Sequence, residues 1–425
     1  MDLNGWKERI KTDRFREDIR VLYSDEVGEN TARYGDLLSL FEKTFGDEGE
    51  LTLFSAPGRT EIGGNHTDHQ HGCVLAASVS MDTIAAVHAT GNRRIRVKSQ
   101  GYPMCEISLD DLSVHEDEKN STAALIRGVA ARFAQLGCRV GGFDAAVTSS
   151  VLPGSGISSS AAFEVLIGNI INNLFFDSHE SAVSIAQISQ YAENVYFGKP
   201  SGLMDQTASS VGNILTIDFK DPSNPHVRQL KVDFKSFNLA LCIIDSGADH
   251  ADLTDEYAAI PNEMKKICRR LGREYLRDIP EEEFIARLPE IRSEVGDRAL
   301  LRAFHFYGDN KRVAFQVEAL EKGDMDTFLR LVRESGYSSW MYLQNIVPAG
   351  RIEHQEMGVA LAMCDTLLNG RGAYRVHGGG FAGTVQAFVP EDMLEEFRNG
   401  IEHALGRGSC HVLSIRPVGG TRIPE

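Results

Sequence analysis

The stretch at residues 151–168, V-L-P-G-S-G-I-S-S-S-A-A-F-E-V-L-I-G, constrains the fold more than any other part of the chain. Apolar residues before it predict a strand, and residues 161–174 have the apolar density of a largely buried helix. Between them, glycines permit close backbone approach, and the N–H groups of the turn and the helix start favour an anion. The serine hydroxyls can cap the helix, contact phosphate oxygens or bind a hard cation. An ordinary serine-capped loop explains this stretch equally well, so the choice between this loop and an anion-binding loop depends on the other motifs.

A chain of 425 residues exceeds what one hydrophobic core usually supports, so we expect two domains. The formal net charge of −16 argues against nucleic acid or a membrane surface as the main partner, because both need a basic footprint. No apolar run reaches the length of about 20 residues that spans a bilayer, and the charged N-terminal segment does not resemble a signal peptide. The 7 scattered cysteines contain no C-x-x-C and favour a reducing compartment. We therefore expect a soluble cytoplasmic protein.

Polar residues gather in residues 58–72, G-R-T-E-I-G-G-N-H-T-D-H-Q-H-G, between two predicted strands. The first strand is predicted to end at the Pro57-Gly58 turn, after amphipathic helices over residues 6–21 and 34–45. Convergent polar groups beside apolar strands are typical of a binding cleft. The three histidines fit either this cleft or a solvated loop, and their spacing does not favour zinc.

Later motifs add further candidates. A helix is predicted over residues 181–196 and carries Glu193, and P-S-G-L-M-D-Q then brings Asp205 to the start of another helix. A long, mostly helical region follows over residues 253–332. Near the end, Y-R-V-H-G-G-G-F-A-G-T-V-Q-A-F-V has a triple glycine between strand-like runs, which indicates close backbone approach to a ligand or another domain, or structural bends.

Together, G-R-x-x-x-G-x-N-H-T-D-H, P-x-x-G-I-S-S-S-A-A and H-G-G-G-F-A-G resemble the ordered motifs of the GHMP kinase superfamily. The segment A-P-G-R-T-E-I-G-G-N-H-T-D-H is similar to the galactokinase signature, whose usual form is A-P-G-R-V-N-L-I-G-E-H-T-D-Y. Residues 202–206, 243–257 and 302–313 also resemble galactokinase segments. The resemblance runs from about residue 51 to the C-terminus.

This resemblance implies an α+β, two-domain GHMP kinase fold with the active site in the interdomain cleft. The N-terminal domain would be ribosomal S5 domain 2-like and the C-terminal domain ferredoxin-like. The turn-rich residues 212–233 are the predicted boundary, which gives domains at 1–215 and 216–425.

The resemblance also implies phosphoryl transfer from ATP, with Mg²⁺, to the anomeric hydroxyl of a hexose, galactose being the first expectation. Asp205 matches the carboxylate near that hydroxyl, and Arg59 the arginine beside it, which would keep Asp205 ionised. Whether Asp205 takes the proton early or mainly orients the hydroxyl stays open. Ser160 and Glu193 match the Mg²⁺-associated positions. The matching sugar-binding positions are Asn65, His66, Asp68, Gly202 and Tyr257, and those of the nucleotide-phosphate loop are Pro153, Gly154, Ser155, Gly156, Ser158, Ser159 and Ser160.

The signature departs from its usual form. Asn65 stands where galactokinases usually carry a glutamate that contacts a sugar hydroxyl, so both the charge and the donor pattern change. A site built for one hydroxyl arrangement rejects analogues strongly, which puts galactose in doubt. Thr60 and Glu61 also replace the usual Val-Asn, Gly63 replaces Ile and His69 replaces Tyr.

Two alternatives stay open: a sugar-1-kinase for an amino sugar, arabinose or a uronic acid, and a non-catalytic sugar sensor. Such sensors lose residues of the Ser-rich loop, which are present here. A P-loop kinase is disfavoured because G-x-x-x-x-G-K-[ST] is absent. A Rossmann oxidoreductase is disfavoured because the only G-x-G-x-x-G, at Gly378, precedes a strand-like run. The expected partners are a sugar and ATP, in a monomer or small homo-oligomer.

Overall fold

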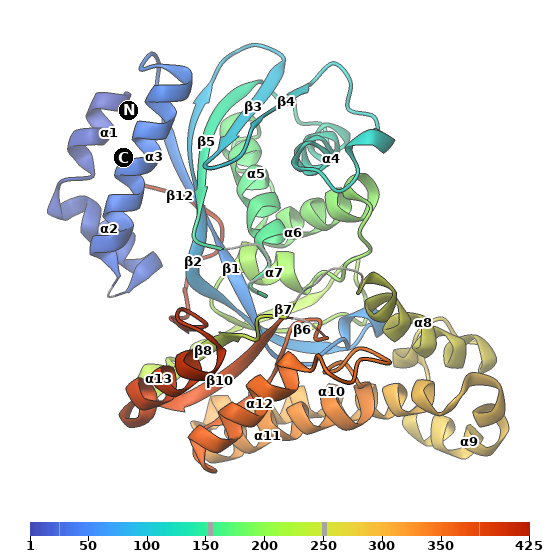
Figure 1. Cartoon of the computed structure of the whole chain (residues 1–425). Helices are drawn as coiled ribbons and strands as arrows, with labels where there is room; N and C mark the ends of the chain where they lie inside the picture. The colour runs from blue at the N-terminus through green and yellow to red at the C-terminus, as the bar shows by residue number, and fades with distance from the viewer. Residues whose placement is uncertain (25, 152–155, 249–252, 382) are drawn as a thin grey trace.

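The computed structural model describes residues 1–24, 26–151, 156–248, 253–381 and 383–425. Within them the chain forms two sheets, an eight-stranded and a four-stranded one (Figure 1). The larger sheet has the order β12-β1-β2-β5-β3-β4, and β6 pairs with β2 and β7 with β6. Its strands are β1 (Thr52–Gly63), β2 (Cys73–Ala89), β3 (Arg94–Ser99), β4 (Met104–Ser108), β5 (Phe143–Ser149), β6 (Ile214–Asp218), β7 (His226–Leu230) and β12 (Thr421–Arg422).

Helices cover both faces of the larger sheet because successive residues of its strands are apolar on opposite faces. Phe54 packs with α4–α6 on one face, whereas the preceding Leu53 packs with α1–α3 on the other. Figure 1 shows these two layers on either side of the sheet. The helices are α1 (Leu3–Arg9), α2 (Asp13–Tyr23), α3 (Val27–Phe45), α4 (Thr122–Gln135), α5 (Ser159–Phe175), α6 (Ala182–Tyr191) and α7 (Met204–Val211).

The smaller sheet is antiparallel in the order β11-β8-β10-β9 and packs against α12 and α13. Four helices, α8–α11, fill the region where the sequence predicts a long helical segment, and α10 and α11 contact β1. The elements are β8 (Leu239–Asp245), α8 (Thr254–Arg270), α9 (Glu281–Val295), α10 (Asp297–Lys322), α11 (Met325–Ser338), α12 (Glu356–Leu368), β9 (Ala373–His377), β10 (Thr384–Pro390), α13 (Leu394–Leu405) and β11 (Cys410–Leu413).

The end of the chain returns to the larger sheet. Strand β12 pairs with β1, and Glu425 lies 3.3 Å from the amino group of Met1, beside the α1–α3 layer (Figure 1). The predicted division at residue 215 stays a prediction; β6, β7 and β12 all belong to the larger sheet. No helix in the described ranges is both long and apolar enough to cross a bilayer.

The prediction that the first strand ends at Pro57-Gly58 is wrong. Strand β1 continues to Gly63, and its register with β2 shifts between Pro57 and Arg59, so the chain bulges instead of turning. The N–H of Arg59 donates to the carbonyl of Ile157 at 3.0 Å, which holds the bulge against the loop before α5. This bulge sets where the Arg59 side chain points.

Two helix boundaries also differ from the sequence prediction. The expected helix over residues 6–21 is two helices, because Thr12 caps α2 by accepting a hydrogen bond from the N–H of Phe15. The expected helix over residues 181–196 ends as an α-helix at Tyr191 and continues as a π-helical turn, η3 (Ala192–Phe197). Such turns are often found at functional sites, and this one carries Glu193.

Candidate active site

The loop before α5 requires a glycine at Gly156, whose φ is +71°. A Cβ there would lie 2.0 Å from Oγ1 of Thr384, at the start of β10, so the smaller sheet closes on this loop. Ser158, at the N-cap of α5, makes no capping hydrogen bond with its side chain. Among the described residues, the first N–H groups of α5 therefore lack a side-chain cap from Ser158, which suits an anion. The candidates Pro153, Gly154 and Ser155 lie outside the described residues.

Arg59 and Asp205 form a bidentate ion pair. Nε and Nη2 of Arg59 lie 2.6 and 2.8 Å from the two carboxylate oxygens of Asp205, in the first turn of α7. Burial alone would raise the pKa of Asp205, but Arg59, Lys199 and a hydrogen bond from Ser158 lower it to about 2. The Asp205 side chain stays 26% exposed, so an ionised carboxylate faces accessible space. Arg59 also donates through Nη1 to the carbonyl of Gly156, which ties this pair to the loop.

The predicted metal-associated residues lie together. The Ser160 hydroxyl donates to Oε1 of Glu193 at 3.0 Å, and Nζ of Lys199 lies 3.0 Å from the same oxygen. Gln206 donates to the other Glu193 oxygen at 2.8 Å and to Glu164 at 3.1 Å. Burial and the neighbouring Glu193 raise the pKa of Glu164 well above its ordinary value. Glu193 is 2% exposed, whereas Lys199 is 56% exposed.

The sugar signature meets the triple glycine at residues 378–380. Nε2–H of His66 donates to the carbonyl of Gly379 at 3.0 Å, and burial lowers the pKa of His66 to about 3. The Tyr257 hydroxyl donates to the carbonyl of Gly380 at 2.8 Å. A Cβ on Gly379 would lie 2.6 Å from the Tyr257 ring, so the backbone of this motif approaches Tyr257 closely.

Two other predicted sugar-binding residues, Asp68 and Gly202, are adjacent, and of the two neighbouring histidines His69 lies beside His66 whereas His71 lies against Tyr275. A Cβ on Gly202 would lie 1.8 Å from Oδ2 of Asp68, so only glycine fits beside this carboxylate. His69 stacks on His66, and His71 stacks on Tyr275 with ring centroids 3.5 Å apart.

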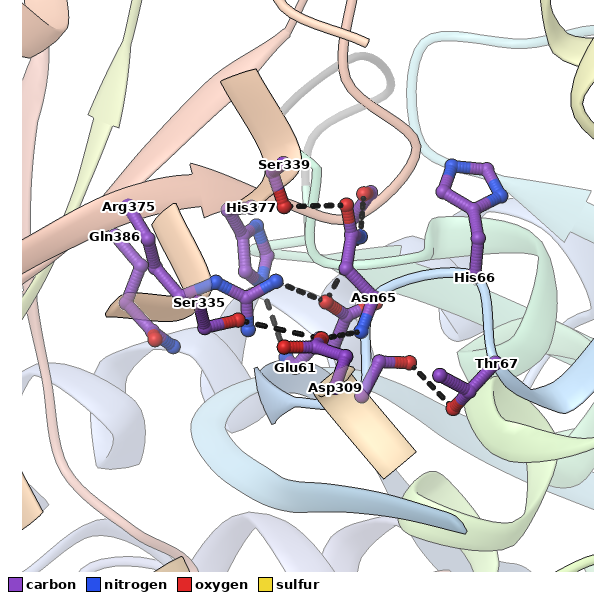
Figure 2. A network of polar contacts seen from close by, with 12 residues as sticks. Glu61, Asn65, His66, Thr67, Asp309, Ser335, Ser339, Arg375, His377 and Gln386 are labelled. Carbon is purple, nitrogen blue, oxygen red and sulfur yellow. Dashed lines mark hydrogen bonds and ion pairs between the residues drawn. The ribbon is translucent and has the colours of Figure 1, made fainter. Parts of the chain in front are cut away.

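Asn65 lies in a network of buried polar side chains (Figure 2). Its backbone N–H donates to Asp309 at 2.9 Å, and its carbonyl accepts from Nε2–H of His305 at 2.9 Å. Its side chain bonds to Glu61, Gly378, Ser339 and Asn345, and it is 0% exposed. Asn65 is therefore held within the protein, unlike Asp205.

Comparison with known proteins finds two family models that match parts of this chain. The galactokinase galactose-binding signature matches residues 39–89, and the GHMP kinases N terminal domain matches residues 124–213. In these two segments the chain is similar to galactokinases and to other GHMP kinases. This confirms the resemblance stated from the motifs.

Solved structures share the fold of this chain. The galactokinase of Lactococcus lactis complexed with galactose has a TM-score of 0.80 at 23% identity, covering 92% of this chain and 99% of that chain. A D-glycero-D-manno-heptose 1-phosphate kinase of Bacteroides thetaiotaomicron has a TM-score of 0.59 at 15% identity, covering 88% and 99%. The mevalonate kinase of Methanococcus jannaschii has a TM-score of 0.59 at 14% identity, covering 87% and 99%. These matches confirm the mixed α+β GHMP kinase fold.

Sequence reasoning missed several residues of this candidate site. Lys199 follows Glu193 in the turn G-K-P-S-G, where an exposed cation near two site carboxylates is a detectable signal. Ser339 and Asn345, which hold Asn65, carry no such signal because they lie some 270 residues away in the sequence. Their contacts arise only from the fold.

Proposed function

We propose that this GHMP kinase is an ATP-dependent sugar-1-kinase that transfers the γ-phosphoryl group to the anomeric hydroxyl of a hexose, with galactose the first candidate. One observation carries the proposal: Arg59 bonds both to Asp205 and to the carbonyl of Gly156. A carboxylate suited to an acceptor hydroxyl is thereby joined to a loop suited to phosphate. The galactose-binding signature at residues 39–89 supports a sugar as the acceptor.

In the proposed reaction, Asp205 accepts a hydrogen bond from the anomeric hydroxyl and aims its oxygen at the γ-phosphorus. The new bond joins that oxygen to phosphorus, the bond from the γ-phosphorus to the bridging oxygen breaks, and ADP leaves. With a pKa of about 2, Asp205 is a weak base, which favours an orienting role with late proton transfer. Arg59 keeps the carboxylate ionised and positioned.

The residues present fit ATP and Mg²⁺. The α5 N-terminus without a side-chain cap, together with Ser158 and Ser159, suits the phosphates. The Ser160 hydroxyl and the Glu193 carboxylate would hold Mg²⁺, since both offer the oxygen ligands that this ion prefers. When bound, Mg²⁺ neutralises charge on the phosphates. Lys199 adds a further positive charge beside Glu193.

For the acceptor, His66, Asp68, Gly202 and Tyr257 are the proposed sugar-binding residues. We also propose a cytoplasmic location, which the free cysteines fit, and domains at residues 1–215 and 216–425 in a monomer or small homo-oligomer.

ADP release from Mg·ATP tests the proposal across galactose, glucose, N-acetylgalactosamine, arabinose and glucuronate. Preference for galactose supports a galactokinase. Preference for another sugar supports the same transfer mechanism with a different sugar as the substrate. Absence of turnover on every sugar, in protein that binds ATP, favours the sensor alternative. Asp205→Asn is the matched inactive control.

A further inference from the structure

Two residues of the sugar signature are exchanged relative to its usual form. The usual signature has asparagine at the position of Glu61 and glutamate at the position of Asn65. In the structure the two side chains touch: Nδ2 of Asn65 donates to Oε1 of Glu61 at 2.9 Å. A carboxylate and a carboxamide are thus both present, but the carboxylate stands at the other position.

The exchanged carboxylate is neutralised inside the protein. Nη2 of Arg375, from β9, lies 2.6 Å from Oε1 of Glu61, and Arg375 is fully buried. The backbone N–H of Glu61 donates to Nε2 of His377 at 3.1 Å. Glu61 therefore fastens β1 to the smaller sheet.

The carboxamide of Asn65 has no bonding capacity left for a ligand. Its two N–H groups donate to Glu61 and to the carbonyl of Gly378, the latter at 2.7 Å. Its oxygen accepts from Ser339 at 3.2 Å and from Asn345 at 2.8 Å (Figure 2 shows the Ser339 contact). A primary amide offers two donors and two acceptor lone pairs, and all four are used.

We propose that Asn65 is a positioning residue that fastens the turn at residues 378–381 to the sugar signature, and that position 65 does not bind the acceptor. The sugar hydroxyl that a glutamate at this position would bind then has no partner here. This inference rests on the proposed function. It predicts weak discrimination at one hydroxyl of the hexose, so that the sugar and its deoxy analogue at that carbon are both acceptors.

We expect the loss of kcat/KM on removing this hydroxyl to be much smaller than the loss on removing any other hydroxyl that the site binds. Sites that hydrogen-bond a substrate hydroxyl reject the analogue lacking it by about 10⁴-fold or more, because buried polar groups are left unpaired. With no unpaired group at position 65, loss of that hydroxyl changes kcat/KM by less than about tenfold. Hydroxyls bound by His66 or Asp68 keep strong discrimination.

The test measures kcat/KM for the preferred hexose and its monodeoxy analogues, one for each hydroxyl other than the anomeric one. We expect one analogue within about tenfold of the parent sugar and the others at least about a hundredfold lower. The proposal is overturned if every analogue loses a hundredfold or more.

The double variant Glu61→Asn with Asn65→Glu restores the usual arrangement and should discriminate at least about tenfold more strongly against the tolerated analogue. Asn172→Ala is the matched control: Asn172 is also buried, with two hydrogen bonds to the Glu180 backbone, but lies at the far end of α5. It should leave the ratio of kcat/KM values unchanged, and an unchanged ratio in the double variant contradicts the proposal.

Calorimetric titration of the same sugars without ATP distinguishes failure of the proposed function from failure of the proposal for Asn65. Binding without turnover on any sugar contradicts the proposed function, and the ratios of Kd then decide on Asn65 by the same criteria. Absence of both binding and turnover overturns both.

Discussion

Replacing Arg59 by methionine should make activity depend on pH where the wild type does not. Asp205 has a pKa of about 2 against an ordinary value of about 3.9, a difference worth about 2.5 kcal/mol in favour of the ionised form. Without Arg59, burial acts against only Lys199 and Ser158, so the pKa of Asp205 rises above its present value. A carboxylate with a raised pKa loses its charge as the pH falls.

The assay is kcat/KM from quenched ADP formation between about pH 5 and pH 9, the range in which a raised carboxyl pKa is visible. In the wild type Asp205 contributes no acid limb in this range. In Arg59→Met, activity should fall by about a hundredfold at neutral pH and decline further as the pH is lowered. The matched control is Arg96→Met, which removes a similar bidentate pair with Asp144 on the larger sheet. Its profile should follow the wild type, and parallel profiles for Arg59→Met and the wild type would refute the reasoning.

The same pair contributes to acid stability with a defined sign. Because the folded-state pKa of Asp205 is depressed, its contribution is fully present above about pH 4 and is lost as the pH falls towards about 2. Urea unfolding at several pH values should show wild-type stability falling across this window. If Asp205 causes part of that fall in stability, the fall should be smaller in Arg59→Met than in the wild type.

Other substitutions test the remaining contacts. Asp205→Asn should lower kcat by about 10³-fold while the variant stays folded, and a folded variant with near-normal turnover would contradict the assignment. Lys199→Met should lower kcat by about tenfold because it removes a cation beside Glu193, whereas Lys199→Arg should retain most activity; equal rates in both would exclude Lys199. Gly202→Ala should raise KM for the sugar by at least about tenfold, since its Cβ would displace Asp68, and an unchanged KM would remove Asp68 from the sugar site. Chelation by EDTA should abolish turnover, and added Mg²⁺ should restore it; full activity in EDTA would contradict the metal role.

Local patterns predict much of this fold and site. The helix at α5 follows from its apolar density and its Gly/Ser start, and the glycines at 378–380 predict the close approach that Tyr257 makes. The Arg59–Asp205 pair follows from the motif resemblance and is present at hydrogen-bond distance. These features depend on short segments whose chemistry is readable from neighbouring residues.

Features that depend on distant segments could not be predicted. The strand through Pro57-Gly58 continues because β2 pairs on both sides of the bulge and Ile157 bonds to Arg59. The substitution at Asn65 is visible in the sequence, but its consequence depends on Ser339 and on Glu61 being bound by Arg375. The composition of the signature does not reveal these partners.

Under the proposed function, strand β1 explains how exchanges at Glu61 and Asn65 alter sugar specificity and leave the transfer chemistry in place. It has two register shifts against β2, one between Pro57 and Arg59 and one between Glu61 and Gly63. Bulges redirect side chains without disrupting the strand. The first brings Arg59 to Asp205 and to Gly156 in the loop before α5, and the second precedes the turn to Asn65. Since separate bulges position the two ends of the site, exchanges at Glu61 and Asn65 should change sugar selectivity while the Arg59–Asp205 pair stays intact.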